Sequence, residues 1–148
     1  VQNGIKPIFY KINTISDPLI LRSTPFISTS NKIFKIPKNE IVKTVQYRNS
    51  TDKNWTSVKY RNKSGYVNSS YLKRYDQNLT FGLVQTKQKS NLNLRREANK
   101  VENNIIDRIP DKSYVRIISN IKTNGFIKVQ YKTQIGYCSI DYITIVTE

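Results

Sequence analysis

The residue types that carry most enzymatic chemistry are scarce in this sequence. It contains no histidine, which excludes a Ser-His-Asp triad, a Cys-His dyad and a His-ligated metal site. Cys138 is the only cysteine, so the sequence forms neither an internal disulfide nor a thiolate metal cluster, and we expect a buried thiol. Among the 10 Asp and Glu residues, Asp107 and Asp111 make the most suggestive acid and base pair, but we expect both in loops. The sequence therefore predicts no enzyme active site, no metal and no cofactor, and leaves open a catalytic domain outside this segment.

The composition describes a folded, strongly basic protein. The 148 residues include 25 Lys and Arg, and the formal net charge is +15. A hydrophobic fraction of 37% with 10 tyrosines is too high for a disordered polycation. No apolar run approaches the roughly 20 residues that a membrane-spanning helix needs. We expect a mature secreted or envelope protein.

The chain contains an internal repeat, which determines how its elements must be assigned. A shift of 73 residues aligns Leu19–Arg22 with Leu92–Arg95 and Ile36-Pro37 with Ile109-Pro110. The shift then becomes 71, and the later matches are Trp55 with Phe126, Val58 with Val129, Tyr60 with Tyr131, Gly65-Tyr66 with Gly136-Tyr137, and Tyr71 with Tyr142. Insertions belong in surface loops, so the stretch 48–54, where the shift changes, is predicted to be a loop in both copies.

Each copy reads as a set of short strands, because apolar and polar residues alternate over four to six positions between turn signals. Strands at 56–60 and 65–68 are predicted to flank a four-residue hairpin loop, Arg61–Ser64, followed by Gly65 where a left-handed or bulged backbone costs little. The second copy repeats this hairpin around Lys132–Ile135, and the segment Glu97–Arg108 is predicted to be a long loop. Short strands in so small a unit bury a common core only by curling, so we predict an all-β chain of two small, strongly bent barrels.

These residues resemble the bacterial SH3 (SH3b) domain in tandem, over about residues 9–74 and 82–147, with a short linker at 75–81. The typical Leu-x-Val-Arg-Ser-Gly-Pro segment is matched by Leu19–Pro25 and Leu92–Ala98. The typical ending is matched in the first copy by Trp55, Val58, Tyr60, Gly65–Val67 and Tyr71-Leu72. The second copy departs further, with Phe126 for Trp, Ala98 for Pro, Cys138 for Val and Ile143 for Leu. Both copies lack the expected glycine in the first loop, at Thr24 and Glu97, and the glycine often found in the following turn, at Asn39 and Lys112.

The resemblance implies a non-catalytic module that attaches envelope proteins to peptidoglycan through a groove beside the aromatic end of each barrel. Carried over residue by residue, it places candidate contacts at Trp55, Tyr66, Tyr71 and Arg22, and at their counterparts Phe126, Tyr137, Tyr142 and Arg95. Flat aromatic surfaces with polar tips suit a polymer of sugar faces and peptide amides. Each residue also has a structural alternative: the Trp and Phe close a barrel end, the arginines tie down their own loops, and the Tyr71 pair caps the last strand.

The positive charge indicates a second kind of partner, a polyanion such as teichoic acid, and a solvated face is the alternative explanation. The lysines concentrate in the first copy, at Lys32, Lys35, Lys38, Lys43, Lys53, Lys59 and Lys63. A basic barrel with exposed rings also suits single-stranded nucleic acid, which we rank second. The sequence thus predicts a cell-wall binding module of a bacterial envelope, periplasmic or secreted protein that binds peptidoglycan or an anionic wall polymer. A protein partner in place of the wall ligand remains an alternative, because SH3-like grooves accept extended peptides. The module is expected to localise itself, an attached hydrolase or a partner protein.

Overall fold

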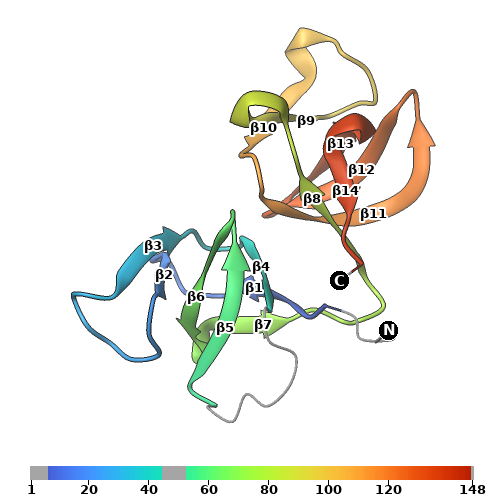
Figure 1. Cartoon of the computed structure of the whole chain (residues 1–148). Coiled ribbons are helices and arrows are strands. Elements are labelled where there is room, and N and C mark those ends of the chain that lie inside the picture. The colour runs from blue at the N-terminus through green and yellow to red at the C-terminus, as the bar shows by residue number, and fades with distance from the viewer. Residues whose placement is uncertain (1–6, 45–52, 148) are drawn as a thin grey trace. The chain divides into compact units, whose positions relative to one another are not determined.

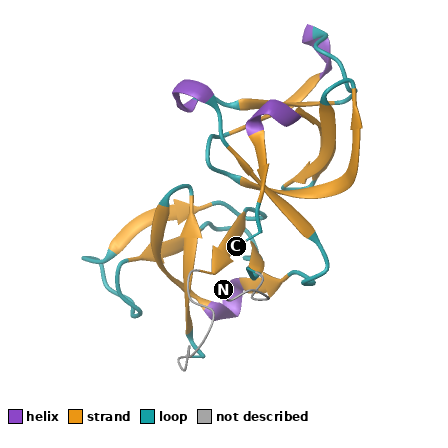
Figure 2. Cartoon of the chain, turned by 45° about the vertical axis from the view of Figure 1, so that its right-hand side comes forward, coloured by secondary structure: helices purple, strands orange, loops and turns teal. Residues whose placement is uncertain are grey.

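The computed structural model describes residues 7–44 and 53–147, and the chain divides into two compact units. The first unit extends to Gln77 and also takes in Thr147, and the second comprises Asn78–Val146. The described residues are almost entirely strands and loops, and their helical segments are four 3-10 turns (Figure 2). None of the helices in the described part is long and apolar enough to cross a membrane. The prediction of an all-β chain is confirmed.

The first unit is a seven-stranded antiparallel sheet with the order β3-β2-β6-β5-β4-β1-β7. Figure 1 shows β5 and β6 crossing the direction of β7, so the sheet bends around its own core. The order ends at β3 and β7, and no ladder among the described residues joins these two edges. The strands are β1 (Phe9–Ile12), β2 (Leu19–Arg22), β3 (Lys32–Ile36), β4 (Ile41–Thr44), β5 (Trp55–Tyr60), β6 (Lys63–Asn68) and β7 (Leu72–Arg74).

The second unit repeats this topology with the order β10-β9-β13-β12-β11-β8-β14, again antiparallel throughout. Its first strand, β8, begins at Thr80, inside the segment that the sequence assigned to the linker. The strands are β8 (Thr80–Val84), β9 (Leu92–Arg95), β10 (Ile105–Ile109), β11 (Tyr114–Thr123), β12 (Phe126–Tyr131), β13 (Gln134–Ser139) and β14 (Ile143–Ile145).

Each unit has its own hydrophobic core, built from the residues that the repeat aligned. In the first unit the fully buried side chains include Leu21, Ile36, Val58 and Tyr60. Their counterparts Leu94, Ile109, Val129 and Tyr131 are buried in the second unit, where Cys138 replaces Val67. Two small cores rather than one large core explain why the apolar pattern repeats along the chain.

The predicted four-residue hairpin loops are two residues long. In the first unit β5 ends at Tyr60 and β6 begins at Lys63, with Tyr60 paired to Lys63. The turn residues Arg61 and Asn62 both have positive φ, 48° and 66°. Two consecutive positive φ values define the tight turn whose twist matches a hairpin. This turn usually contains a glycine, but here its residues are Arg61 and Asn62. The sequence therefore predicted a longer loop.

Gly65 and Gly136 are required by close packing, not by a left-handed backbone. Both lie inside strands, β6 and β13, and neither has a positive φ. A Cβ atom at Gly65 would lie 2.5 Å from the backbone oxygen of Arg22, and one at Gly136 would meet the backbone oxygen of Arg95. Glycine therefore lets β6 and β13 approach the strands that carry the two arginines.

Two predicted loops in the second copy contain strands. The segment aligned with 48–54 continues β11 to Thr123 and turns at Asn124 and Gly125, with φ of 53° and 80°. In the first copy, residues 45–52 lie outside the described residues, so only Lys53 and Asn54 of that predicted loop are described. The predicted loop Glu97–Arg108 is also too long, because Ile105–Ile109 forms β10 and pairs with β9. β10 forms because β9 pairs with it, and the charge content of the segment itself does not reveal that pairing.

Candidate ligand-binding grooves

A cavity of about 530 Å³ opens beside the first sheet, between the loop after β1 and the aromatic end of β5. Trp55, Arg22 and Tyr71 line it together. Its outer wall is apolar, because Ile15 is 92% and Ile27 74% exposed. Exposed isoleucines around a half-buried tryptophan offer a surface for an apolar or amphipathic ligand. We call this cavity groove 1.

The loop between β2 and β3 is held by a buried arginine and asparagine. Arg22, 8% exposed, donates from Nη1 to the carbonyl oxygen of Ser28 at 2.8 Å and to Oδ1 of Asn31 at 2.9 Å. The amide nitrogen of Asn31 donates to Thr24 Oγ1 at 2.8 Å and to the carbonyl oxygen of Phe26 at 2.7 Å. Charge-assisted bonds to buried acceptors fix a loop more firmly than neutral ones. Arg22 therefore positions the loop that carries Ile27, as the structural alternative proposed.

The loop after β1, which also lines groove 1, is anchored at Asn13 and at Ile15. Asn13 donates its backbone N–H to the carbonyl oxygen of Tyr71 at 2.7 Å. Lys38, from the turn between β3 and β4, donates from Nζ to the carbonyl oxygen of Ile15 at 2.6 Å. Tyr71 itself ends the 3-10 turn Ser69–Tyr71, in which the backbone N–H of Ser70 donates to Oδ1 of Asn68. The exposed isoleucine and tyrosine are thus held on defined backbone.

The second unit has a smaller cavity of about 280 Å³ at the equivalent place, which we call groove 2. Phe126, Arg95 and Tyr142 line it, as their counterparts line groove 1. Arg95 donates from Nη1 to the carbonyl oxygen of Val101 at 2.9 Å and to Oδ1 of Asn104 at 3.0 Å. The arginine and asparagine arrangement of the first unit is therefore repeated.

The structure brings together three of the four site residues predicted in each copy. The exceptions are Tyr66 and Tyr137, which do not line the grooves. Each stands on the neighbouring strand directly opposite the arginine, Tyr66 opposite Arg22 and Tyr137 opposite Arg95. Lys128 lies over the Tyr137 ring, with Nζ 6.0 Å from the ring centre. The exposure of the aromatic residues also differs between the units, because Trp55 is half-buried whereas Phe126 is 5% exposed.

Comparisons with known proteins return only solved structures of low similarity. No family model matches the sequence, and no curated protein matches it. Among solved structures, NlpC2 from Trichomonas vaginalis is similar with a TM-score of 0.39 and 16% identity, over 97% of this chain and 49% of that one. NlpC1 from the same organism is similar with a TM-score of 0.39 and 14% identity, over 97% of this chain and 47% of that one. The chain thus spans about half the length of these two proteins.

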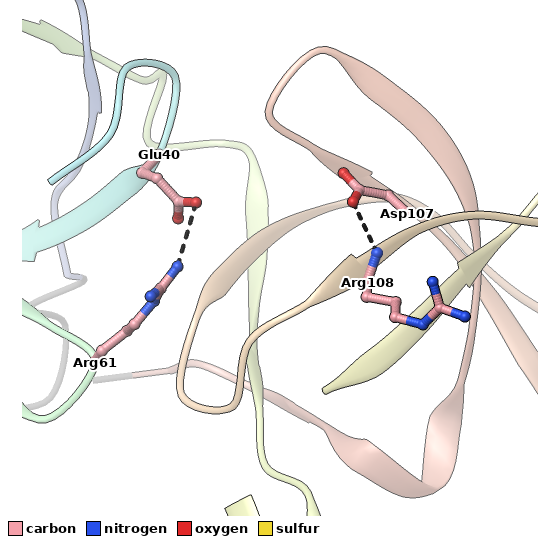
Figure 3. A network of polar contacts seen from close by, with 4 residues as sticks. All are labelled: Glu40, Arg61, Asp107 and Arg108. Carbon is pink, nitrogen blue, oxygen red and sulfur yellow. Dashed lines mark hydrogen bonds and ion pairs between the residues drawn. The ribbon is translucent and has the colours of Figure 1, made fainter. Parts of the chain in front are cut away.

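The carboxylates that the sequence made candidates for acid and base chemistry serve the fold. Asp107 accepts a hydrogen bond from the backbone N–H of Arg108 at 2.8 Å, and Figure 3 shows the guanidinium group directed away from it. Asp111 accepts from the backbone N–H of Thr86 at 2.8 Å and so fixes the loop that lines groove 2. The described residues contain no group of three or more Asp, Glu or Cys side chains that could hold a metal ion.

Two further polar or reactive groups are buried in the units. In the first, Arg61 Nη2 lies 3.6 Å from Oε2 of the fully buried Glu40 (Figure 3), and its guanidinium group lies over the Tyr60 ring. In the second, burial raises the pKa of the Cys138 thiol to about 12, although the positive charge of Arg95 opposes that rise. A thiol with so high a pKa is a poor nucleophile at neutral pH, so Cys138 is structural.

Sequence reasoning missed the loop asparagines and the exposed isoleucines. Asn31 and Asn104 are separated by 73 residues and are identical, so the repeat itself marked them. Each asparagine accepts a hydrogen bond from an arginine nine residues earlier, Arg22 or Arg95, and the spacing in the sequence does not reveal that contact. Ile15 and Ile27 lie in loops without alternation, where apolar residues carry no periodic signal.

Proposed function

We propose that the chain is a non-catalytic module, built of two SH3b-like domains at about 9–74 and 82–147, that binds peptidoglycan or an associated wall polymer. The observation that carries this proposal is the convergence, in both units, of an aromatic ring, an arginine and a tyrosine on one groove. The resemblance of the sequence to SH3b domains implies those residue types at those places. The proposal places the protein in a bacterial envelope or among secreted proteins, where it localises itself, an attached hydrolase or a protein partner.

The shape and chemistry of groove 1 fit a peptide-bearing glycan. Its volume of about 530 Å³ accommodates a short segment of the ligand. The half-buried Trp55 and the exposed Tyr71 offer ring faces with polar edges. The exposed Ile15 and Ile27 add apolar contact for peptide carbons. Ring faces and apolar side chains gain free energy by covering the ligand surface, and the contact is insensitive to salt. Two grooves on one chain raise the effective concentration of the second contact once the first has formed.

Co-sedimentation with purified sacculi tests the proposal. The chain is mixed with intact sacculi and with sacculi stripped of accessory polymers, across a salt series, beside a single-stranded DNA control. Retention on stripped sacculi at high salt, lost in Trp55→Ala, is the expected result. Retention at low salt only, equal on DNA, shows that the charge of +15 acts without specificity, and absence of retention on both kinds of sacculi overturns the proposal.

The matched control for Trp55→Ala is Phe126→Ala in the second unit. Both substitutions remove a ring from an equivalent strand position, but Phe126 is 5% exposed and belongs to the interior. We expect Trp55→Ala to lower retention with little loss of stability, and Phe126→Ala to destabilise its unit by about 3 kcal/mol. A loss of stability in Trp55→Ala as large as that in Phe126→Ala would contradict a ligand role for Trp55, because the loss of retention would then follow from unfolding.

A further inference from the structure

The two grooves have the same framework but opposite surface chemistry. In groove 1 the loop residue after Thr14 is Ile15, and in groove 2 the residue after Thr86 is Lys87. At a separation of 73 residues, the exposed Ile27 becomes Lys100. The same shift replaces two further wall residues, Pro18 by Asn91 and Ile20 by Asn93. The apolar wall of groove 1 is therefore a polar and cationic wall in groove 2.

The ionised side chains around each groove reinforce this difference. Groove 1 is lined by one cation, Arg22, and one carboxylate, Asp17. Groove 2 is lined by three cations, among them the exposed Lys87 and Lys100, and by the single carboxylate Asp141. The first copy is the more basic in sequence, yet more cations line the groove of the second copy. A groove with excess positive charge attracts an anionic ligand.

Aromatic surface is reduced in groove 2. Phe126 is 5% exposed where Trp55 is half-buried, and Tyr142 is half-buried where Tyr71 is 44% exposed. Short polar side chains line both grooves, Thr86, Ser90 and Ser139 in groove 2 and Thr14, Ser16 and Asn68 in groove 1. Hydroxyl and amide groups are hydrogen-bond partners for a polyol, and Lys side chains bind phosphate as point charges.

We propose that groove 2 binds the phosphate groups of a linear polyol-phosphate polymer, while groove 1 binds an uncharged, apolar segment of the wall. This inference rests on the proposed function and divides it between the two units. The loops that line groove 2 are already held in place. Arg95 holds the loop that carries Lys100, and Asp111 holds the loop that carries Lys87. The two lysines thus stand on two different anchored loops.

Nucleic acid fits groove 2 less well than a polyol phosphate. Single-stranded nucleic acid gains much of its affinity from bases stacked on exposed rings. Phe126 is buried, and the wall residues that replace the isoleucines are lysine and asparagine. A polyol phosphate has no bases, and its hydroxyl groups match the polar wall.

The test is a calorimetric titration of the full chain with poly(glycerol phosphate), with polyglutamate and oligo-dT as comparison polyanions. The variant Lys87→Gln with Lys100→Gln removes both groove lysines. Its control, Arg108→Gln with Lys122→Gln, removes two exposed cations of the same unit that do not line the groove. The reciprocal variant, Ile15→Lys with Ile27→Lys, gives groove 1 the lysines of groove 2.

We expect the groove variant to bind poly(glycerol phosphate) about tenfold more weakly and the control variant less than threefold. The dependence of log affinity on log salt should fall by about one to two in the groove variant only. The reciprocal variant should gain affinity for the same polymer. Equal losses in the groove and control variants, equal affinity of the wild-type chain for polyglutamate or oligo-dT, or no binding of poly(glycerol phosphate), would overturn the inference.

Retention on sacculi separates this failure from failure of the proposed function. If intact sacculi retain the chain but the groove lysines do not affect polymer affinity, the wall-binding function stands and the assignment of groove 2 is wrong. If intact sacculi do not retain the wild-type chain, the proposed function itself is wrong.

Discussion

The loop that carries Ile27 should collapse when the asparagine that supports it is removed. Asn31 is 6% exposed and accepts a hydrogen bond from Arg22 Nη1 at 2.9 Å. Its amide nitrogen donates to Thr24 Oγ1 at 2.8 Å and to the carbonyl oxygen of Phe26 at 2.7 Å. Asn31→Ala removes all these contacts at once and leaves the buried guanidinium group with one acceptor fewer.

The size of the effect follows from these contacts. Two neutral hydrogen bonds contribute about 1 kcal/mol each, and the bond to the arginine about 1.5 kcal/mol. Because the loop carbonyls partly recover water, we expect Asn31→Ala to cost about 3 kcal/mol. A unit of about 70 residues has a total stability of roughly 4–10 kcal/mol, so the loss is a large share. The equivalent change in the second unit, Asn104→Ala, should cost about 2 kcal/mol, because Arg95 is half-buried rather than buried.

Trp55 provides the assay, because it is the only tryptophan and lies in the first unit. Its fluorescence during urea unfolding reports on that unit, and far-ultraviolet circular dichroism reports on both. With an m-value of about 1 kcal/mol/M for a unit of this size, Asn31→Ala should lower the Trp55 midpoint by about 3 M urea.

The matched variant Asn104→Ala makes the experiment specific. It should leave the Trp55 transition nearly unchanged while altering the dichroism transition. A Trp55 midpoint that moves by less than about 0.5 M in Asn31→Ala would refute the reasoning that the Arg22 and Asn31 contacts hold the loop.

Three further predictions concern backbone and burial. Lys112 has φ of 70°, where glycine is favoured, so Lys112→Gly should stabilise the second unit by about 0.5 kcal/mol in urea unfolding followed by dichroism, and destabilisation would contradict this account of the turn. Gly65→Ala places a Cβ 2.5 Å from the backbone oxygen of Arg22 and should cost about 1–3 kcal/mol by Trp55 fluorescence, whereas a neutral effect would show that the strands separate freely. Burial raises the pKa of Cys138 from 9.0 to about 12, so the thiolate fraction at pH 8 is lower than in the unfolded chain. A thiol reagent should therefore label Cys138 only after unfolding, and rapid labelling of the folded chain would contradict its burial.

The repeat made the fold and part of the site predictable from the sequence. Aligned apolar positions predicted two all-β units, because strand alternation and a pattern that occurs twice can be found in one sequence. Trp55, Arg22 and Tyr71, which line groove 1, came instead from the resemblance to SH3b domains.

Turns and loop contacts were not predictable, because they depend on residues far apart in the chain. The hairpin turn adopts positive φ at Arg61 and Asn62 without glycine, because the register of β5 and β6 imposes it. The strand β10 forms within a charged segment because β9 offers it a partner. Likewise, Gly65 is needed for a close approach to Arg22 that only the folded sheet creates.

The fluorescence of Trp55 during titration with soluble peptidoglycan fragments is the decisive test of whether groove 1 binds the cell wall. Because Trp55 is the only tryptophan and lines the groove, a bound fragment should cover its ring and change its emission. We predict a saturable shift that persists at high salt and weakens in Ile15→Ser, which leaves the ring in place but removes a neighbouring exposed contact. Unchanged Trp55 emission at fragment concentrations that block retention of the chain on sacculi would contradict the claim.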